Sequence, residues 1–353
     1  MTIKRPAAFA IPGDATQKTG GYIYEYELLQ ALRRNGRQVH HIELGSGFPE
    51  PSPAETAAAI DAMASLPPDM PLIIDGLVFG SVETAGLARV KAPIIAMIHH
   101  PLGLETGLSP ERSAHLLQRE ADNLALARAV LVPSPHTARI LQEQFGVPQH
   151  KITIALPGFR PADPVRNLVS PPLILSVGLL AARKGHDILV AALAKIRDLS
   201  WQAQIVGKTH DPAVEANLRR QIEDLHLTDR VALTGLLDDA DLIERYRRAT
   251  IFALATRYEG YGIVLGEALL HGLPIVTCRT GAVPDTVPDG AGILVPVDDA
   301  ERFAAALRRL LSDDELRQGM SKTARQAGQA LPSWDETSAI ADTVLDAVSD
   351  NSR

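Results

Sequence analysis

Short, mainly apolar segments alternate with helix-like segments along the first half of the chain. The apolar segments lie at 7–12, 39–44, 71–75, 92–98 and 129–134, and segments with helical periodicity lie at 22–34, 54–65 and 113–127. A strand that is apolar on both faces has to be covered on both sides, which is typical of a parallel sheet between two layers of helices. The pattern therefore predicts a doubly wound α/β domain.

A second series of the same kind follows a proline-rich stretch at 157–172. Its strand-like segments lie at 172–178, 201–207, 231–235, 251–256, 273–278 and 292–296, with helix-like segments at 187–197, 213–225 and 241–248. A length of 353 residues also exceeds that of a typical single core. We therefore predict an α/β protein with two doubly wound, Rossmann-like domains that face each other across a cleft. The predicted boundaries are 1–165 and 166–335, followed by a helix over 336–353 that packs back onto the N-terminal domain.

Composition narrows the classes of function. The formal net charge of −7 argues against a general nucleic-acid-binding protein. The single cysteine, Cys278, cannot form an intrachain disulfide and lies in an apolar run, so we expect a buried thiol in a reducing compartment. No apolar stretch approaches the roughly 20 residues that span a bilayer, and Pro12 and Gly13 end the N-terminal run too early for a signal peptide. We expect a cytoplasmic protein that contacts the inner face of the membrane at most peripherally.

Polar residues and glycines follow several of the predicted strands. Ligands of doubly wound sheets bind at the carboxyl ends of the strands, so residues at these positions are candidates for a site. Such residues are Gly20 and Gly21 after the first strand, His99 and His100 after the strand at 92–98, Lys184 after the strand at 172–178, and Glu259 after the strand at 251–256.

The segment "RYEGYGIVLGEALLHG" changes character halfway along its length. Glu259 lies among glycines and tyrosines, which suits an irregular loop, whereas Glu267 lies among good helix formers that end at Gly272. The start of such a helix offers unpaired N–H groups and a partial positive charge, which together bind anions. The two flanking carboxylates would repel a bare phosphate. A ligand that carries both an anionic group and hydroxyl groups is therefore predicted.

Several segments together resemble the retaining glycosyltransferases of family four, which have the GT-B architecture. "EGYGIVLGEALLHGLPIV" is similar to the Glu-x7-Glu segment of that family and the Gly-Leu-Pro that leads into its next strand, and "ILSVGLLAARKGHDILVAAL" is similar to its lysine-containing loop. "GLLDDADLIERYRRATIFALATRYEGYG" and "AVLVPSPHTARILQEQFGVPQHKITIALPGF" continue the resemblance over almost the whole chain. It implies an N-terminal acceptor-side domain and a C-terminal domain that binds a nucleotide sugar.

The resemblance assigns donor-binding roles in the C-terminal domain. Glu267 matches the glutamate that holds the ribose hydroxyls, and Glu259 matches the one that contacts the donor sugar. Lys184 matches the lysine that neutralises the leaving diphosphate. The family usually has an arginine where this chain has Leu179, and Arg183 is a candidate substitute for that cation. Backbone amides of the segment that follows Glu259 are expected to contact the diphosphate or the sugar; its residues are Gly260, Tyr261, Gly262 and Ile263.

The resemblance also assigns residues of the N-terminal domain. Gly20 and Gly21 resemble the glycine pair where the backbone lies against phosphate or acceptor. Either His99 or His100 matches the histidine that faces the reacting sugar, and the sequence leaves open which one. Glu105, in a nearby loop, is a candidate for acceptor contact. Their adjacency argues against a metal site formed by the two histidines, because neighbouring side chains on a strand point to opposite faces.

The predicted reaction is the transfer of a sugar from a nucleotide-diphosphate sugar to a hydroxyl of a small-molecule, glycan or lipid-linked acceptor, with retention and without a metal or other cofactor. The alternatives are a GT-B nucleotide-sugar epimerase or phosphorylase, and a non-catalytic protein that binds nucleotide sugars. A metal-dependent mechanism has one feature in its favour. Asp239 and Asp241 have the spacing with which the other large glycosyltransferase architecture holds a metal ion, but they also precede a helix that acidic residues would cap.

Overall fold

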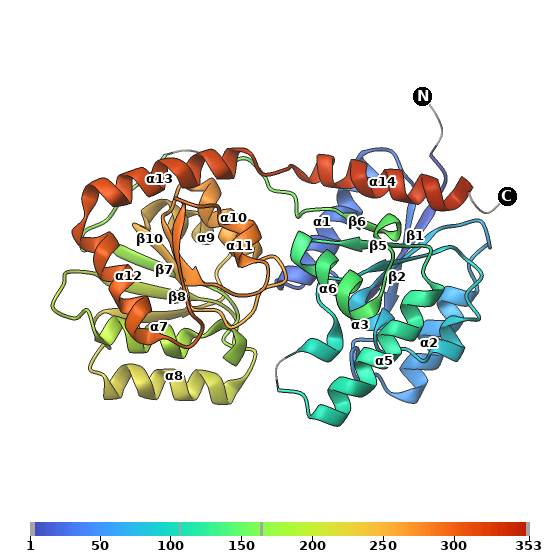
Figure 1. Ribbon diagram of the computed structural model, residues 1–353, viewed down its shortest axis with the longest axis horizontal. Coiled ribbons are helices and arrows are strands. Elements are labelled where there is room, and N and C mark those ends of the chain that lie inside the picture. The colour runs from blue at the N-terminus through green and yellow to red at the C-terminus, as the bar shows by residue number, and fades with distance from the viewer. Residues whose placement is uncertain (1–3, 106, 163–164, 351–353) are drawn as a thin grey trace. The chain divides into compact units, whose positions relative to one another are not determined.

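The computed structural model describes residues 4–105, 107–162 and 165–350 (Figure 1). The chain forms two compact units, of which the first comprises Met1–Gly158 with Pro332–Arg353 and the second comprises Phe159–Leu331. The sequence predicts these divisions at 165/166 and 335/336, whereas the structure has them at 158/159 and 331/332. Each unit contains a six-stranded parallel sheet with flanking helices, which confirms the predicted α/β class with two doubly wound sheets.

The sheet of the first unit has the strand order β2-β1-β3-β4-β5-β6. Its strands are β1 (Ala7–Pro12), β2 (Val39–Leu44), β3 (Leu72–Asp75), β4 (Ile94–Met97), β5 (Ala129–Val132) and β6 (Ile152–Ile154). Strands β1, β3, β4 and β5 are buried at every position, as expected from their uninterrupted apolar sequences. The edge strand β6 lies outside the predicted segments, because three partly exposed residues leave no clear apolar run.

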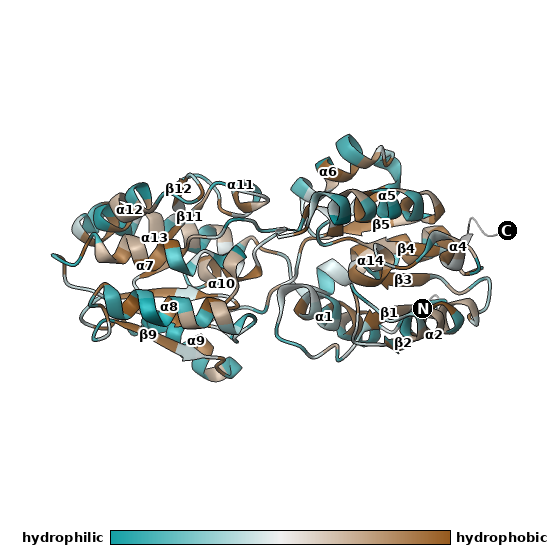
Figure 2. Ribbon diagram, turned by 90° about the horizontal axis from the view of Figure 1, so that it is seen from below, coloured by the Kyte–Doolittle hydropathy of each residue, from teal (hydrophilic) through white to brown (hydrophobic). Residues whose placement is uncertain are grey.

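Helices cover both faces of this sheet. They are α1 (Gly20–Arg34), α2 (Pro53–Ala64), α3 (Gly76–Phe79), α4 (Thr84–Leu87), α5 (Pro110–Leu126), α6 (Pro135–Phe145) and α14 (Trp334–Asp350), with 3-10 turns η1 (Leu102–Leu104) and η2 (Gln149–Lys151). Helix α14 returns from the far end of the sequence and packs along α1 (Figure 1). Within each unit the strands are mainly apolar, and outer helices such as α5 and α8 carry many polar residues (Figure 2).

The sheet of the second unit has the strand order β12-β11-β10-β7-β8-β9. Its strands are β7 (Leu173–Val177), β8 (Gln202–Val206), β9 (Val231–Gly235), β10 (Ile251–Leu254), β11 (Ile275–Cys278) and β12 (Gly292–Val295). Its helices are η3 (Ala182–Lys184), α7 (His186–Ala194), α8 (Pro212–Asp224), α9 (Asp239–Arg248), α10 (Ile263–Leu270), α11 (Val283–Thr286), α12 (Ala300–Ser312) and α13 (Asp314–Gln329). Helices α12 and α13 lie outside the predicted set, although buried Phe303, Leu307 and Leu310 have helical spacing. Cys278 is buried at the end of β11, as its apolar run predicts.

The helix N-termini fall into two groups. Side chains accept hydrogen bonds from the first-turn N–H groups of most long helices, as Ser52 does at α2, Ser109 at α5 and Ser134 at α6. Helices α1, α7 and α10 have no such side-chain cap among the described residues. They follow β1, β7 and β10, and each begins at or directly after a glycine. Their first N–H groups are therefore available to a ligand at the carboxyl ends of these strands.

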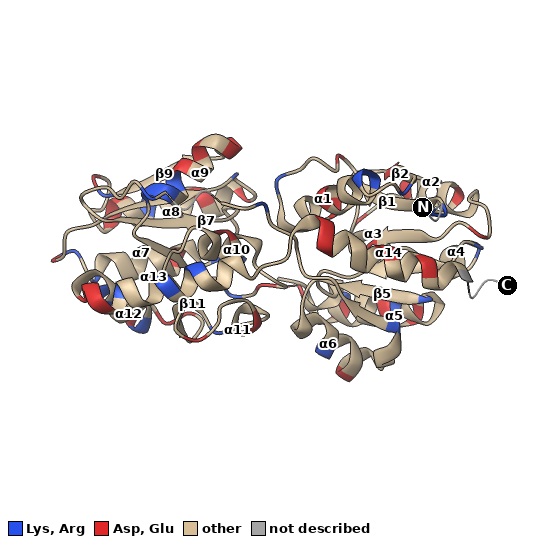
Figure 3. Ribbon diagram, turned by 90° about the horizontal axis from the view of Figure 1, so that it is seen from above, with Lys and Arg blue, Asp and Glu red and all other residues tan. Residues whose placement is uncertain are grey.

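Acidic and basic side chains are interspersed over the helices of both units, as on α12 and α13 (Figure 3). In the part of the chain that the structure describes, we find no helix with both the length and the apolar character to cross a bilayer.

A buried arginine attaches the C-terminal helix to the first unit. The side chain of Arg37 is fully buried, and it forms ion pairs with Asp342 and Asp346 of α14. Its Nη1 donates to the carbonyl oxygen of Arg5 at 2.8 Å. Asp342 also pairs with Lys4 near the start of the chain. The two ends of the sequence are therefore joined through one charge cluster.

We expect Arg37→Leu to lower the free energy of unfolding by about 3–5 kcal/mol, because it leaves carboxylates without their buried partner. Urea denaturation followed by circular dichroism measures this loss. Arg34→Leu is the matched control, since Arg34 forms an exposed pair with Asp335 at 3.3 Å and should change stability by less than about 1 kcal/mol. Equal effects of the two substitutions would contradict the role given to Arg37.

Candidate active site

An ion pair lies at the carboxyl ends of β7 and β10 in the second unit. The Nζ of Lys184 donates to Oε1 of Glu259 at 2.6 Å, and Arg183 Nη1 lies 3.9 Å from the other carboxylate oxygen. Thr256, just after β10, also donates to Oε1 at 2.9 Å. The structure thus brings together three of the residues that the sequence singles out, with Thr256 as an additional contact that the sequence analysis did not predict.

The electrostatics of this pair keep Glu259 ionised. The carboxyl is only 5% exposed. Burial by itself would raise its pKa, but the charges of Lys184 and Arg183 and the two hydrogen bonds to Lys184 and Thr256 outweigh burial, so the pKa lies below its usual value. The ammonium of Lys184 therefore neutralises a buried carboxylate.

Two glycines allow the surrounding loops to come this close. Gly281 has a φ of +53°, and a Cβ there would lie 2.2 Å from the carbonyl oxygen of Glu259. That same carbonyl accepts a hydrogen bond from the N–H of Ala282 at 2.8 Å. Gly185, with a φ of +63°, leaves no space for a Cβ, which would lie 1.9 Å from the carbonyl oxygen of Ala255. The backbone on either side of the ion pair is thus fixed by close contact.

The loop from Gly260 leads into the N-terminus of α10. Tyr261 is 8% exposed, and its carbonyl oxygen accepts from Thr286 at 2.8 Å. Gly262 has a φ of +86° and occupies the N-cap position, where it has no side chain to bond the N–H groups that begin at Ile263. The predicted combination of an irregular loop and an open helix start is present.

Glu267 lies on α10 and is held by a tyrosine. The hydroxyl of Tyr246 on α9 donates to Oε2 of Glu267 at 2.7 Å. Tyr246 is buried, and its ring stacks on His271 with a centroid distance of 4.9 Å. Burial and the adjacent carboxylate raise the pKa of Tyr246 well above its usual value, so it stays a neutral donor. Tyr246 was not predicted; the one signal in the sequence is a single aromatic residue on a helix rich in charged residues.

Leu179 stands where relatives are expected to have an arginine. Its backbone carbonyl group contacts a neighbouring side chain. Its carbonyl oxygen lies 3.2 Å from Nε2 of the buried His186. Arg183, the candidate substitute cation, donates to the carbonyl oxygen of Tyr258 at 3.0 Å. Its guanidinium is thereby held beside the ion pair formed by Lys184 and Glu259.

A second cluster lies at the corresponding edge of the first unit. His99 follows β4, and its Nε2 lies 3.3 Å from Oε1 of Glu25 on α1. Asp75, the last residue of β3, completes a trio whose ligand atoms all lie within 4.8 Å of one another. Glu25 and Asp75 were not predicted as site residues. Glu25 shares its predicted helix with Glu27, and Asp75 ends a predicted strand, so nothing local in the sequence distinguishes either acid.

Further residues of the first unit surround His99. A Cβ on Gly21 would lie 3.5 Å from Cδ2 of His99, whereas a Cβ on Gly20 would meet nothing within 4 Å. The ring of Tyr24 packs edge-on against His99 with a centroid distance of 5.1 Å. His100 is half-buried beside it, and Glu105 is exposed in the loop after η1. The structure therefore brings His99 and Gly21 together and leaves Glu105 on the surface.

The aspartates that suggest metal binding begin a helix instead. Asp239 and Asp241 lie in the first turn of α9, and the N-cap residue Asp238 accepts from the N–H of Asp241 at 2.8 Å. Acidic side chains at this end complement the helix dipole. Among the described residues, the group of histidine and acidic side chains compact enough to surround an ion is the trio of Glu25, Asp75 and His99.

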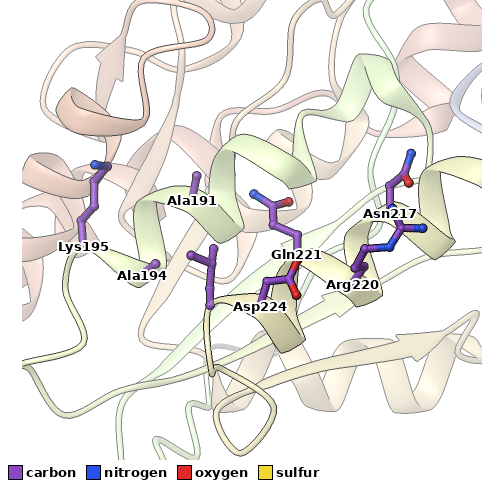
Figure 4. Close-up of a pocket in the computed structure, with 8 residues that line it drawn as sticks. Ala191, Ala194, Lys195, Asn217, Arg220, Gln221 and Asp224 are labelled. Atoms are coloured by element: carbon purple, nitrogen blue, oxygen red, sulfur yellow. The ribbon is translucent and has the colours of Figure 1, made fainter.

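A shallow groove of about 550 Å³ lies between α7 and α8 (Figure 4). It is lined by Ala191, Ala194, Lys195, Asn217, Arg220, Gln221, Asp224 and Leu225. These residues belong mainly to the C-terminal halves of the two helices, which in a parallel α/β sheet lie toward the amino ends of the strands. The groove is therefore separate from the candidate site at the carboxyl ends.

The two parallel six-stranded sheets with flanking helices match the two-domain GT-B architecture. Residues 162–327 match the family model described as "Glycosyl transferases group 1". The match lies within the second unit, and together with the relatives below it identifies a glycosyltransferase.

Among its relatives, the D-inositol 3-phosphate glycosyltransferase of Acidothermus cellulolyticus is 29% identical over 314 residues, which cover 80% of this chain and 69% of that protein. Matches to the next curated relatives cover between 45% and 70% of their own length. The structure of sucrose-phosphate synthase from Thermosynechococcus elongatus aligns with a TM-score of 0.81 and 24% identity, covering 98% of this chain and 99% of that one. Anabaena HepE in complex with UDP and glucose aligns with a TM-score of 0.74 and 18% identity, covering 97% and 99%.

We expect Gly281→Ala to destabilise the protein by about 1–3 kcal/mol, because it combines a left-handed φ with a clash at the carbonyl of Glu259. Urea denaturation measures the change. Gly319→Ala is the control: Gly319 is exposed within α13 and has open space around it, so alanine should stabilise by up to about 1 kcal/mol. A Gly281→Ala protein as stable as the parent would show that this contact does not constrain the loop.

Proposed function

We propose that the protein transfers a sugar from a nucleotide-diphosphate sugar to a hydroxyl acceptor with retention at the anomeric carbon, and that it needs neither a metal nor another cofactor. The observation that carries this proposal is the uncapped N-terminus of α10, with Glu267 on one side and the Lys184–Glu259 pair on the other. This arrangement offers N–H donors for an anion and carboxylates for hydroxyl groups within one short segment.

Glu267 is the proposed ligand of the ribose. A carboxylate accepts hydrogen bonds from both hydroxyls of a cis-diol, provided that its orientation is fixed. The hydrogen bond from Tyr246 fixes Glu267 at Oε2. Glu259, ionised and buried, is the proposed acceptor for hydroxyls of the donor sugar.

The leaving diphosphate is the group that needs positive charge. An ammonium has three N–H donors, so Lys184 can keep its hydrogen bond to Glu259 while another N–H reaches a phosphate oxygen. Arg183 and the first N–H groups of α10 add to this charge in place of the missing arginine at Leu179. Such fixed dipoles and cations stabilise charge that develops on the leaving group.

The first unit is proposed to bind the acceptor. His99 is the proposed residue that faces the reacting sugar, since its ring is positioned by Glu25 and Tyr24. Gly20 and Gly21, at the uncapped start of α1, allow a ligand to approach the backbone. We propose that the acceptor attacks from the face that the diphosphate leaves, and that a departing phosphate oxygen takes the acceptor proton.

Donor and acceptor are proposed only as classes. The complex of HepE with UDP and glucose supports a nucleoside diphosphate as the leaving group. The curated relative described above is named for an inositol phosphate, and sucrose-phosphate synthase is named for a sugar phosphate, which supports a polyol or sugar acceptor.

An assay with UDP-, GDP-, ADP- and dTDP-sugars as donors distinguishes a transferase from an epimerase and from a non-catalytic binding protein. A transferase releases nucleoside diphosphate much faster when a panel of inositol phosphates and hexose phosphates is present than with the donor alone. An epimerase would release free sugar from the donor alone. A non-catalytic relative would bind a nucleotide sugar in calorimetry and leave it intact with every acceptor.

Glu267→Ala should weaken nucleotide binding by roughly 30- to 150-fold, because a charged hydrogen-bond acceptor contributes about 2–3 kcal/mol. Tyr246→Phe should weaken it by roughly 2- to 12-fold through loss of one neutral hydrogen bond. Glu259→Gln should lower kcat with nucleotide affinity largely kept. Calorimetry and initial rates measure these effects, with exposed Glu223→Ala on α8 as the control. If Glu267→Ala binds the nucleotide as tightly as the parent does, the ribose does not bind at Glu267.

Turnover should persist in excess EDTA, because Lys184, Arg183 and the start of α10 supply the charge that a metal would otherwise carry. Asp239→Asn combined with Asp241→Asn should leave kcat unchanged and lower stability slightly through the weakened helix dipole interaction. Initial rates with and without EDTA provide the measurement. Complete loss of turnover in EDTA that Mg²⁺ or Mn²⁺ restores would overturn the metal-independent mechanism.

A further inference from the structure

The two acidic side chains next to His99, those of Glu25 and Asp75, are almost completely buried. Glu25 is 1% exposed and Asp75 is 4% exposed, whereas the side chain of His99 is 23% exposed. Glu25 lies on α1, Asp75 at the end of β3 and His99 after β4, so three separate elements converge on one point. Two carboxylates that lie this close, as those of Glu25 and Asp75 do, repel each other unless one of them holds a proton.

The hydrogen bonds of Asp75 indicate which of its two oxygens can share a proton with Glu25. Its Oδ1 accepts from the N–H of Leu77 at 2.8 Å and of Val78 at 3.4 Å, which caps the short helix α3. Its other oxygen is therefore the one available to Glu25. Burial, followed by the charge of Glu25 and a hydrogen bond to it, raises the pKa of Asp75 well above its usual value. Burial raises the pKa of Glu25 to about 7, and the hydrogen bond from Asp75 limits that rise.

The protonated acid is therefore Asp75, and Glu25 ionises first. The Glu25 carboxylate then accepts from the O–H of Asp75 and from Nε2–H of His99, whose Nε2 lies 3.3 Å from its Oε1. Burial lowers the pKa of His99, so the imidazole is neutral at pH 7. A neutral ring that donates from Nε2 has its lone pair on Nδ1.

We propose that Asp75 and Glu25 are positioning residues for sugar transfer: the chain from the Asp75 hydroxyl through the Glu25 carboxylate to Nε2–H of His99 fixes the tautomer in which Nδ1 accepts a hydrogen bond from the sugar. This inference rests on the proposed function for the role of His99, but the tautomer itself does not depend on turnover. The single buried negative charge behind the ring also favours the positive charge that develops on the sugar in the transition state.

Other ionisable groups that face the chain do not compete for its proton. Tyr22 and Tyr24 on α1 lie beside the two acids, and burial together with the acidic neighbours raises the pKa of each tyrosine, that of Tyr22 to about 12. Both remain neutral near pH 7. The hydroxyl of Tyr24 is already bound to the carbonyl oxygen of Ala155 at 2.8 Å.

Nitrogen NMR of the full chain labelled with ¹⁵N-histidine tests the tautomer directly. Signals of His99 are assigned by their loss in His99→Gln. We expect the Nε2–H tautomer at pH 8, and a change in the ¹⁵N shifts with a midpoint near pH 7 as Glu25 takes up a proton. A predominant Nδ1–H tautomer would overturn the proposal, as would stoichiometric Zn²⁺ binding to the trio that Glu25→Gln abolishes.

The pH dependence of kcat then tests whether this chain serves the reaction. In the parent, kcat should fall as the pH drops through about 7, because protonated Glu25 loses its negative charge and accepts only a weaker hydrogen bond from His99. Glu25→Gln should lower kcat on the order of 10- to 100-fold and remove this acidic limb. Asp75→Asn should keep most of the activity, since its amide still donates to Glu25 and its oxygen still caps α3, whereas Asp75→Ala should not.

Exposed Glu50→Gln, in the loop after β2, is the control and should have the parental pH profile. If the parent transfers sugar but Glu25→Gln has the parental kcat and acidic limb, the positioning role is wrong and the proposed function stands. If the parent transfers no sugar although the tautomer is as expected, the proposed function is wrong.

Discussion

The buried ion pair between Lys184 and Glu259 is the interaction on which the candidate donor site depends. A carboxylate that is 5% exposed remains charged here only because the ammonium lies 2.6 Å away and Thr256 and Arg183 support it. The pair joins the loop after β7 to the loop after β10, and the second of these loops leads into α10. Removal of either partner would leave an uncompensated buried charge, so substitutions that retain hydrogen bonding report on function more cleanly than alanine does.

The two units have similar arrangements of a helix start and a buried carboxylate. In each, a helix that follows an inner strand has no side-chain cap at its start: α1 begins at Gly20, and α10 begins directly after Gly262. In each, a buried carboxylate near that helix start is bound to a basic partner, Glu25 to His99 and Glu259 to Lys184. The difference is the charge of the partner. Lysine keeps Glu259 ionised, whereas neutral His99 and a second acid leave Glu25 with a pKa of about 7. The first cluster therefore responds to pH in the physiological range, and the second does not.

The sequence predicts the fold well because buried parallel strands are uninterrupted apolar runs. It also predicts the segment from Glu259 to Glu267, since the glycines and the helix start are local features. Contacts between elements that are distant in the sequence cannot be predicted from such local features. Glu25 and His99 are 74 positions apart and Tyr246 and Glu267 are 21 apart, so no local pattern marks Glu25, Asp75 or Tyr246. The unit boundary is seven residues earlier than predicted, at 158 instead of 165, because Phe159 packs on Gly266 of α10 and thus belongs to the second unit.

The central claim is that a nucleotide-diphosphate sugar binds the second unit at the start of α10. A crystal structure of the full chain with the donor that stabilises it most in a thermal-shift screen tests this directly. We expect the diphosphate within hydrogen-bond distance of Lys184 Nζ and the N–H of Ile263, and the ribose hydroxyls on Glu267. A nucleotide bound elsewhere, such as in the groove between α7 and α8 or against the first unit alone, would contradict the account.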